Sequence, residues 1–177
     1  AGSGFCLALG EDGTLWGWGS NESGQLGSQA AEYNNSPAPI PLEKGLRFTK
    51  LAVGGEHVVA LTEDGKVYAW GASGPGLRGD ANVPTEIEFQ EKVVVTDIAT
   101  SGSHTLALTE DGEVYAWGEN GEGQLGTGNT RNANRPTLVA SPMPDGPQTT
   151  AVLTLGESAS VLVNGGPEDG LCYISVS

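Results

Sequence analysis

Basic side chains are scarce in this chain, and the shortage narrows the partners it can bind. Only 8 Lys and Arg residues stand against 22 Asp and Glu residues, which gives a formal net charge of −14. Because phosphate backbones are bound mainly by Lys and Arg, direct binding of nucleic acid or of a membrane surface is disfavoured. The acidic balance fits a protein partner with a basic face, or a surface charge that serves solubility alone.

Cysteine is almost absent as well. Cys6 and Cys172 lie far apart in strand-like segments, with no C-x-x-C spacing. We expect both to be small buried hydrophobic residues, which suits a reducing compartment and predicts an intracellular protein, cytoplasmic or nuclear. The sequence shows no signal peptide, and no apolar run approaches the roughly 20 residues that a membrane helix needs.

Glycine, in contrast, is abundant, with 28 residues that follow no three-residue period and form no low-complexity run. Such a composition is typical of many tight turns between short strands. It favours an all-β fold: a sandwich, a barrel or a propeller.

One segment of 17 residues occurs three times. Residues 102–118 read GSHTLALTEDGEVYAWG, residues 55–71 match them at 13 positions, and residues 3–19 match at 8. The turn glycines Gly13, Gly65 and Gly112 are 52 and 47 residues apart, a repeat length found in propeller blades and in some helical arrays. Apolar residues alternate with a period of two on both sides of each Glu-Asp-Gly turn, so each copy is predicted to be a strand hairpin.

Each hairpin is followed by a Gly-rich turn, then by a Pro-led segment at Pro39, Pro84 or Pro136 that introduces a further strand. In all, 14 candidate strands run from Phe5–Leu9 to Cys172–Val176. At four strands per blade they amount to about three and a half blades of a β-propeller.

Residues 104–129, HTLALTEDGEVYAWGENGEGQLGTGN, resemble the repeat of the regulator of chromosome condensation family. The strand, the turn and the Gly-Gln-Leu-Gly element recur together over about residues 1–140; the middle copy departs, with Leu77 and Arg78 where the others have Gln and Leu. The resemblance implies a seven-bladed β-propeller of four-stranded antiparallel blades, of which this chain forms a part. We predict a single β-propeller repeat region over residues 1–177. Its repeats span about 1–47, 48–92 and 93–140, with a degenerate fourth at 150–177.

An arc of three and a half blades leaves a bare sheet edge at each end, and such edges invite pairing with other strands. A two-fold axis cannot map a seven-bladed ring onto itself, so a symmetric homodimer is not the regular closed form. We therefore expect the missing blades to come from the rest of a longer chain or from another chain.

The recurring residues are predicted to be structural. The Asp and Glu pairs before Gly13, Gly65 and Gly112 suit turn chemistry, because a catalytic pair is needed once and not three times. Trp18, Trp70 and Trp117 occupy one site per blade and are expected to pack in the core. His57 and His104 share a further site and are each expected to be hydrogen-bonded within their own blade. No phosphate-binding, nucleophile or zinc motif is present, so no enzyme, metal or cofactor is predicted.

The variable connections are the better candidates for recognition, because loops on a rigid scaffold usually carry binding residues. They span Ser28–Ser36, Ala72–Asn82, Asn129–Asn134 and Ser141–Thr150. The candidate partner-binding residues in or beside them are Asn34, Asn35, Arg78, Arg131, Asn132, Asn134 and Arg135. The predicted function is a non-enzymatic protein-interaction module. The alternative is a regulator of nucleotide exchange on a small GTPase, although no connection is long enough to be the wedge that such a factor needs.

Overall fold

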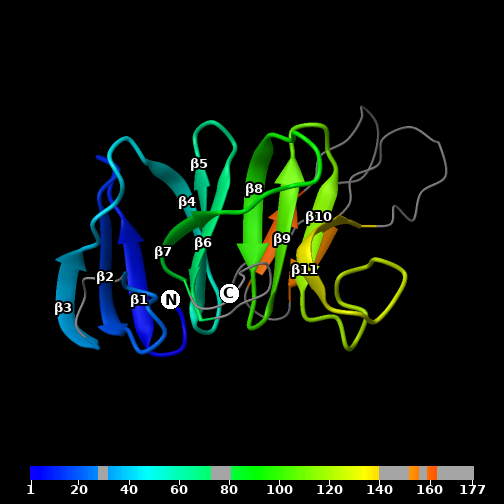
Figure 1. The fold of residues 1–177 in the computed structure, drawn as a ribbon. Coiled ribbons are helices and arrows are strands. Elements are labelled where there is room, and N and C mark those ends of the chain that lie inside the picture. Colours follow the sequence, from blue (N-terminus) through cyan, green and yellow to red (C-terminus); the bar gives the residue numbers. More distant parts are fainter. Residues whose placement is uncertain (28–31, 73–80, 140–151, 156–158, 163–177) are drawn as a thin grey trace.

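The computed structural model describes residues 1–27, 32–72, 81–139, 152–155 and 159–162. These residues form antiparallel strands joined by turns, without a helix (Figure 1). Within the same residues there is accordingly no helix long and apolar enough to span a membrane. The all-β class expected from the glycine-rich turns and two-residue periodicity is confirmed.

Three main sheets follow one another along the chain. The first holds β1 (Phe5–Leu9), β2 (Leu15–Ser20) and β3 (Tyr33–Pro39). The second holds β4 (Phe48–Val53), β5 (His57–Thr62), β6 (Val67–Gly71) and β7 (Ala81–Glu86). The third holds β8 (Val95–Thr100), β9 (His104–Thr109), β10 (Val114–Gly118) and β11 (Ala133–Leu138). A separate pair consists of β12 (Val152–Leu155) and β13 (Ala159–Leu162).

The described residues thus contain 13 strands, where the sequence predicts 14. The expected last strand, Cys172–Val176, lies outside the described residues. The second and third sheets are four-stranded and antiparallel, as predicted. The first sheet contains three strands, which correspond to the last three strands of each full sheet.

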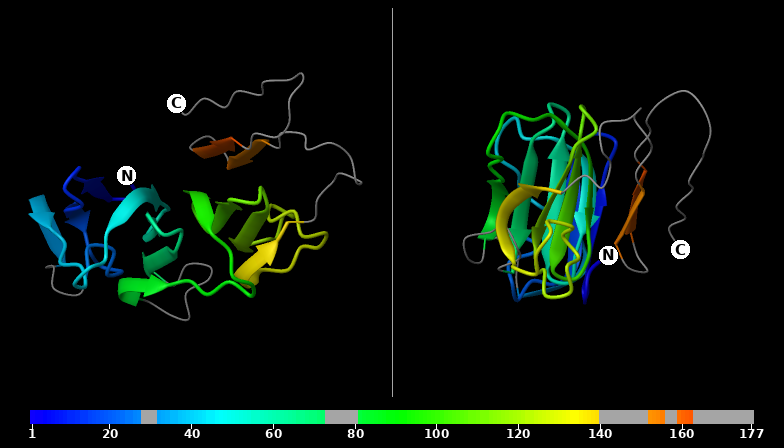
Figure 2. Two further views of the ribbon diagram at one scale, coloured as in Figure 1. Left: turned by 90° about the horizontal axis from the view of Figure 1, so that it is seen from above. Right: turned by 90° about the vertical axis from the view of Figure 1, so that its right-hand side faces the viewer.

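The three sheets stand side by side like sectors of a fan (Figure 2). The first strands of the two full sheets, β4 and β8, lie on the inner side of the fan, and β7 and β11 lie on its outer side. Within each sheet consecutive strands are neighbours, and the tight turns that join β1 to β2, β5 to β6 and β9 to β10 lie at the same end (Figure 1).

Each outermost strand contains a bulge and a proline at equivalent places. The pairing register shifts between Gly17 and Gly19, between Ala69 and Gly71, and between Ala116 and Gly118. This register aligns Pro37 with Pro84 and Pro136, within β3, β7 and β11. The sequence suggested that these prolines precede a strand, but they lie within one. The proline of the first sheet that corresponds to Pro84 and Pro136 is Pro37 and not Pro39. Proline is tolerated there because the outer edge of an edge strand needs no backbone donor.

The sheets pack closely because small residues face large ones. A Cβ on Gly17 would lie 2.8 Å from side-chain atoms of both Leu26 and Ile40, so nothing larger than glycine fits there without movement. Ala69 and Ala116 occupy the equivalent places in the next sheets and are buried. The small-against-large arrangement predicted from the repeats is present.

The recurring tryptophans fill the space between neighbouring sheets. Trp70 and Trp117 are fully buried, as expected. Trp70 stacks on Phe48, with ring centroids 5.7 Å apart. Its Nε1 donates at 3.0 Å to the main-chain oxygen of Gln25, in the connection between β2 and β3 of the first sheet. Trp18 is only partly buried. Trp70 thus joins the second sheet to the preceding one through both packing and a hydrogen bond.

Candidate functional site

The two ends of the sheets carry different kinds of connection. The hairpin end holds the turns that join β1 to β2, β5 to β6 and β9 to β10, where the Glu-Asp-Gly motif recurs. The loop end holds the connections that join β2 to β3, β4 to β5, β8 to β9 and β10 to β11. The Glu-Asp-Gly turns are nearly the same in every repeat, whereas the connections from β2 to β3 and from β10 to β11 differ.

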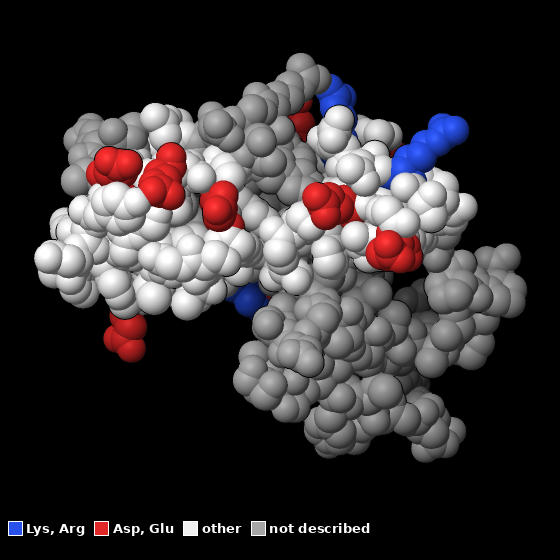
Figure 3. Space-filling view, turned by 90° about the horizontal axis from the view of Figure 1, so that it is seen from below, with Lys and Arg blue, Asp and Glu red and all other residues white. Residues whose placement is uncertain are grey.

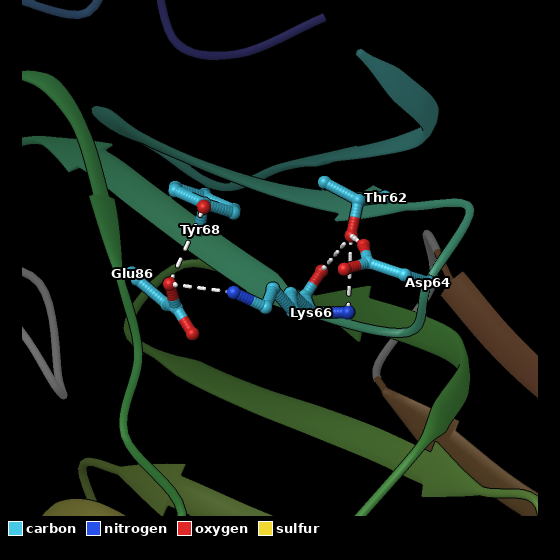
Figure 4. Close-up of polar contacts among 5 residues, drawn as sticks. All are labelled: Thr62, Asp64, Lys66, Tyr68 and Glu86. Carbon is cyan, nitrogen blue, oxygen red and sulfur yellow. Dashed lines mark hydrogen bonds and ion pairs between the residues drawn. The ribbon is translucent and has the colours of Figure 1, made fainter. Parts of the chain in front are cut away.

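Two of the recurring aspartates, Asp12 and Asp64, accept hydrogen bonds within their own turns. The Asp12 carboxylate accepts from the main-chain nitrogen and the hydroxyl of Thr14, both at 2.9 Å. These hydrogen bonds hold the pKa of Asp12 below its usual value. Asp64 accepts from the Thr62 hydroxyl at 2.5 Å (Figure 4). The geometry is that of turn stabilisation and not of a pair of carboxylates converging on a substrate.

The turn glycines have the backbone conformation that their sequence context predicts. Gly13, Gly65 and Gly112 have φ angles of 84°, 79° and 82°. This region is unfavourable for residues with a Cβ, so the recurrence of glycine has a local conformational cause.

Next to the second hairpin, three side chains form a surface cluster. Glu86 on β7 accepts from the Lys66 ammonium at 3.4 Å and from the Tyr68 hydroxyl at 3.3 Å (Figure 4). Burial, followed by the charge of Glu86, raises the pKa of Tyr68. The carboxylate raises the pKa of Lys66 as well, by accepting its hydrogen bond. The cluster links β6 to β7 at the surface.

At the loop end, Asn120 organises the connection between β10 and β11. Its side chain is fully buried. Its Oδ1 accepts from the main-chain nitrogen of Leu125 at 2.9 Å, and its Nδ2 donates to the main-chain oxygens of Asn129 at 2.8 Å and Arg131 at 2.9 Å. One amide therefore fixes both sides of a long connection, which presents its exposed side chains in a defined arrangement.

The first repeat uses the same device. Asn21 Oδ1 accepts from the main-chain nitrogen of Leu26 at 2.7 Å, and its Nδ2 donates to the Gly27 oxygen at 3.2 Å. Sequence reasoning missed this asparagine. Its recurrence in the sequence could have indicated it. Asn is the third residue of the turns at 19–27 and 118–126, whereas the middle copy has Ser73 at that position.

Acidic side chains are spread over the loop end. The exposed residues of this kind are Glu22, Glu32, Glu56, Glu119 and Glu122. Arg131 is the one basic residue on these connections within the described ranges. Seen from below, acidic side chains cross this face in a row over all three sheets, and the basic ones lie at its border (Figure 3).

Hydrogen bonds hold several of these acids in place. The Tyr33 hydroxyl donates to Glu22, which raises the pKa of that tyrosine. The Ser103 hydroxyl donates to Glu119 at 2.6 Å. The hairpin end also includes the connections from β3 to β4 and from β7 to β8, and there the acids are accompanied by four basic residues: Lys44, Arg47, Lys66 and Lys92. Within the described ranges the loop-end connections have a single basic residue, Arg131, beside five exposed glutamates.

The predicted partner-binding residues are distributed over several elements. Asn34 and Asn35 were expected in a connection and lie in β3, and Asn134 and Arg135 likewise lie in β11. All four are thus on outermost strands, because pairing begins earlier than the polar sequence suggests.

The other three predicted residues differ from one another. Arg131 is exposed in the connection before β11, as expected. Asn132 accepts from the Asn120 main-chain nitrogen at 2.9 Å, which gives it a part in shaping that connection. Arg78 lies outside the described residues.

One of the two histidines, His57, does not make the contact that was predicted. The His57 imidazole is buried, and its Nε2 lies 2.8 Å from the Thr100 hydroxyl. Thr100 belongs to the third sheet, so the expected bond within one blade is wrong and the contact crosses between blades. The sequence could not show this, because the partner is brought to His57 by packing and not by strand pairing.

The described residues contain no group of three or more His, Cys, Asp and Glu side chains arranged to hold a metal ion. Cys6 is a free cysteine, and Cys172 lies outside the described residues. The arrangement that remains is a rigid stack of sheets with an acidic, loop-bearing end.

Comparison with known proteins agrees with this geometry. A family model described as the regulator of chromosome condensation (RCC1) repeat matches residues 12–61, 64–108 and 111–149. A second RCC1 repeat model matches residues 95–124. The chain belongs to this family. The fold is therefore a part of an RCC1-type β-propeller, as the resemblance implied.

Individual relatives share the repeat and extend well beyond it. The mitochondrial RCC1 domain-containing protein RUG3 of Arabidopsis thaliana is 42% identical over 79 residues, which are 45% of this chain and 18% of RUG3. Human WBSCR16 superposes with a TM-score of 0.70 at 32% identity, covering 83% of this chain and 39% of that chain. Prp20p from Saccharomyces cerevisiae superposes with a TM-score of 0.67 at 23% identity, covering 80% and 37%, and shows the fold alone.

This chain therefore spans about a fifth of RUG3 and about two fifths of each solved structure. Because RUG3 is mitochondrial, membership of the family does not fix the cytoplasmic or nuclear compartment that the cysteine usage suggested.

Proposed function

We propose that this chain is a non-enzymatic protein-interaction module whose loop end binds a basic segment of a partner protein. The observation that carries the proposal is the row of exposed glutamates on connections that differ between repeats (Figure 3). Repeats supply the rigid support, and their variable connections supply recognition.

The loop end has the physical properties of a docking face. The connection around Asn120 is fixed by three main-chain hydrogen bonds to one buried amide, so little entropy is lost when a partner binds it. Tyr33, with 62% of its surface exposed, lies beside Glu22. An exposed aromatic ring next to a carboxylate suits a Lys or Arg side chain, which gains from both groups.

The negative charge adds speed and selectivity to binding. With a net charge of −14 the chain repels acidic surfaces and attracts basic ones over about a Debye length. Association with the partner is expected to slow as salt rises, and duplex DNA is expected not to bind near physiological salt.

A pair of charge-reversed variants tests the face. The loop-end variant carries three substitutions: Glu22→Lys, Glu56→Lys and Glu119→Lys. The control changes the charge by the same amount at the hairpin end: Glu11→Lys, Glu63→Lys and Glu110→Lys. All six residues are exposed, so both variants are expected to fold. Each protein is used as bait in an affinity capture, with partners quantified by mass spectrometry.

We expect partners captured by the wild type and by the hairpin-end control to be lost with the loop-end variant. Equal loss in both variants would show that net charge alone attracts them. Unchanged capture by the loop-end variant would place the binding face elsewhere, and the outer-strand residues Asn34, Asn35, Asn134 and Arg135 would then be the next candidates.

The alternative function, regulation of nucleotide exchange on a small GTPase, stays a prediction. The yeast Prp20p structure was solved together with its binding properties to Gsp1p and histones, which is a property of that protein. Release of labelled nucleotide from candidate GTPases in the presence of this chain would support exchange, and release at the intrinsic rate would leave the docking function alone.

A further inference from the structure

A buried histidine joins the second sheet to the third. His57, at the start of β5, has 4% of its surface exposed, and its Nε2 lies 2.8 Å from the Thr100 hydroxyl at the end of β8. That hydroxyl also lies 2.9 Å from the main-chain oxygen of His104 and 2.9 Å from the hydroxyl of Thr105. The contact is thus part of a buried polar network at the boundary between two sheets.

One arrangement of protons satisfies every member of this network. The main-chain oxygen of His104 can only accept, so we assign the Thr100 proton to it and let the Thr100 oxygen accept from His57. In this assignment His57 Nε2 carries the hydrogen, and Nδ1 carries a lone pair in the neutral ring. A second proton would be added at Nδ1 and would place a full positive charge at the buried boundary.

We propose that His57 makes the boundary between the second and third sheets acid-sensitive, so that its protonation loosens the two sheets from one another. The inference is independent of the partner that the loop end binds. It concerns a group that the proposed docking face does not use.

Among the described residues, no acidic side chain stabilises a positive charge on the ring. The ring lies directly on Gly54, where an added Cβ would be 2.2 Å from the ring Cε1. From β8 it meets the hydroxyl of Thr100, which in turn lies beside the Thr105 hydroxyl of β9. The His104 imidazole is close enough for its charge to act on the ring. Burial, and then the charge on His104, lower the pKa of His57.

The carboxylates on the same elements are engaged elsewhere. Glu56 accepts from the Ser23 hydroxyl at 3.4 Å, and Asp97 pairs with Lys50. Protons still have access, because Gly54 and Thr100 line a cleft between β4 and β8. The site is therefore reachable by protons from solvent and poorly suited to the charged form of the ring.

The same chain contains an apolar version of this boundary. Phe5 pairs with Gly19 as His57 pairs with Gly71, so Phe5 holds the equivalent place in the first sheet. Val53 ends β4 as Thr100 ends β8, and it packs in one hydrophobic cluster with Phe5. The boundary between the first and second sheets is thus Phe against Val, which cannot titrate. This supplies a natural design for the control.

The direction of the pH effect follows from the lowered pKa. In the unfolded chain His57 takes up a proton near its ordinary value of about 6.5, whereas in the folded chain it resists until lower pH. The stabilisation is therefore complete above about pH 6.5 and is lost as the pH falls from there toward the folded pKa. Within that window each pH unit raises the unfolding constant by up to about tenfold per histidine affected.

The test compares the wild type with the double variant His57→Phe and Thr100→Val, which copies the Phe5 and Val53 boundary. Unfolding in urea is measured from pH 7.5 to pH 5, and amide hydrogen exchange in β8 and β9 is followed over the same range. We expect the wild-type unfolding constant to rise more steeply below pH 6.5 than that of the double variant, with faster exchange at Thr100 and Thr105 after correction for intrinsic rates.

Parallel pH profiles for the two proteins would overturn the proposal, because the loss would then belong to other groups. His104→Phe serves as a second comparison, since His104 is less buried and its pKa is also lowered by burial. If the double variant does not fold, titration of the His57 ring by NMR in the wild type decides. A ring that takes up its proton near its ordinary value without faster exchange across the boundary would refute the idea.

Discussion

Replacement of Asn120 by Ala removes a buried amide from the connection between β10 and β11. The side chain is fully buried and makes close hydrogen bonds to three main-chain groups: the nitrogen of Leu125 and the oxygens of Asn129 and Arg131. Alanine can replace none of these bonds, and a methyl group leaves space where the amide was.

The cost is worked out bond by bond. Leu125 is 1% exposed, so its main-chain nitrogen would be left without a partner in a buried position, at about 1–3 kcal/mol. Asn129 and Arg131 are exposed, so water can reach their carbonyl groups and each loss is about 0.5 kcal/mol. We expect Asn120→Ala to lower the free energy of unfolding by about 2–4 kcal/mol.

Urea unfolding followed by tryptophan fluorescence measures the loss. Asn21→Ala removes the equivalent but less buried amide and is expected to cost less than Asn120→Ala. Asn35→Ala changes an exposed residue and serves as the control, expected within about 0.5 kcal/mol of the wild type. If Asn120→Ala fell within the same range as Asn35→Ala, the connection would not depend on this amide, and the reasoning would be refuted.

Three further outcomes are expected. Trp70→Phe keeps an aromatic ring but loses the hydrogen bond to Gln25, and should lower the free energy of unfolding in urea by about 1–2 kcal/mol. An unchanged free energy of unfolding would show that packing alone joins the first and second sheets. Gly71→Ala should lower the stability of the fold more than Gly112→Ala. Both glycines have positive φ, but only at Gly71 would the new Cβ meet a main-chain oxygen, at 2.4 Å. A lower melting temperature for Gly112→Ala than for Gly71→Ala would contradict this. Glu86→Gln should lower the pKa of Tyr68 toward its ordinary value of 10.0, since the neighbouring carboxylate contributes to raising it; an unchanged ultraviolet titration would leave burial as the whole cause.

The repeat pattern predicted the hairpins because their causes are local. The Glu-Asp-Gly turn and the two-residue alternation around Trp70 and Trp117 are properties of a few neighbouring residues. The prediction was weaker for the outermost strands. Four polar residues were predicted to lie in connections but belong to strands β3 and β11: Asn34, Asn35, Asn134 and Arg135. An edge strand with one exposed face needs no apolar pattern, so its sequence looks like a loop.

Sequence repetition also misled the interpretation of His57. Its recurrence at one repeat position gave no indication of the sheet that supplies its hydrogen-bond partner. Asn120 was passed over because a polar residue in a Gly-rich turn looks exposed. Its burial depends on main-chain carbonyls up to 11 residues away, which the folded connection brings together.

By itself the sequence determined the strands, their turns, the repeat and the acidic character, because these follow from residue order, glycine conformation and charge. Only the tertiary structure decided which residues meet between sheets: Trp70 with Gln25, and His57 with Thr100. It also decided that the variable connections share one end with a row of glutamates. Contacts between sheets arise from packing of faces whose residues are 40 or more positions apart, and no local pattern encodes such pairs.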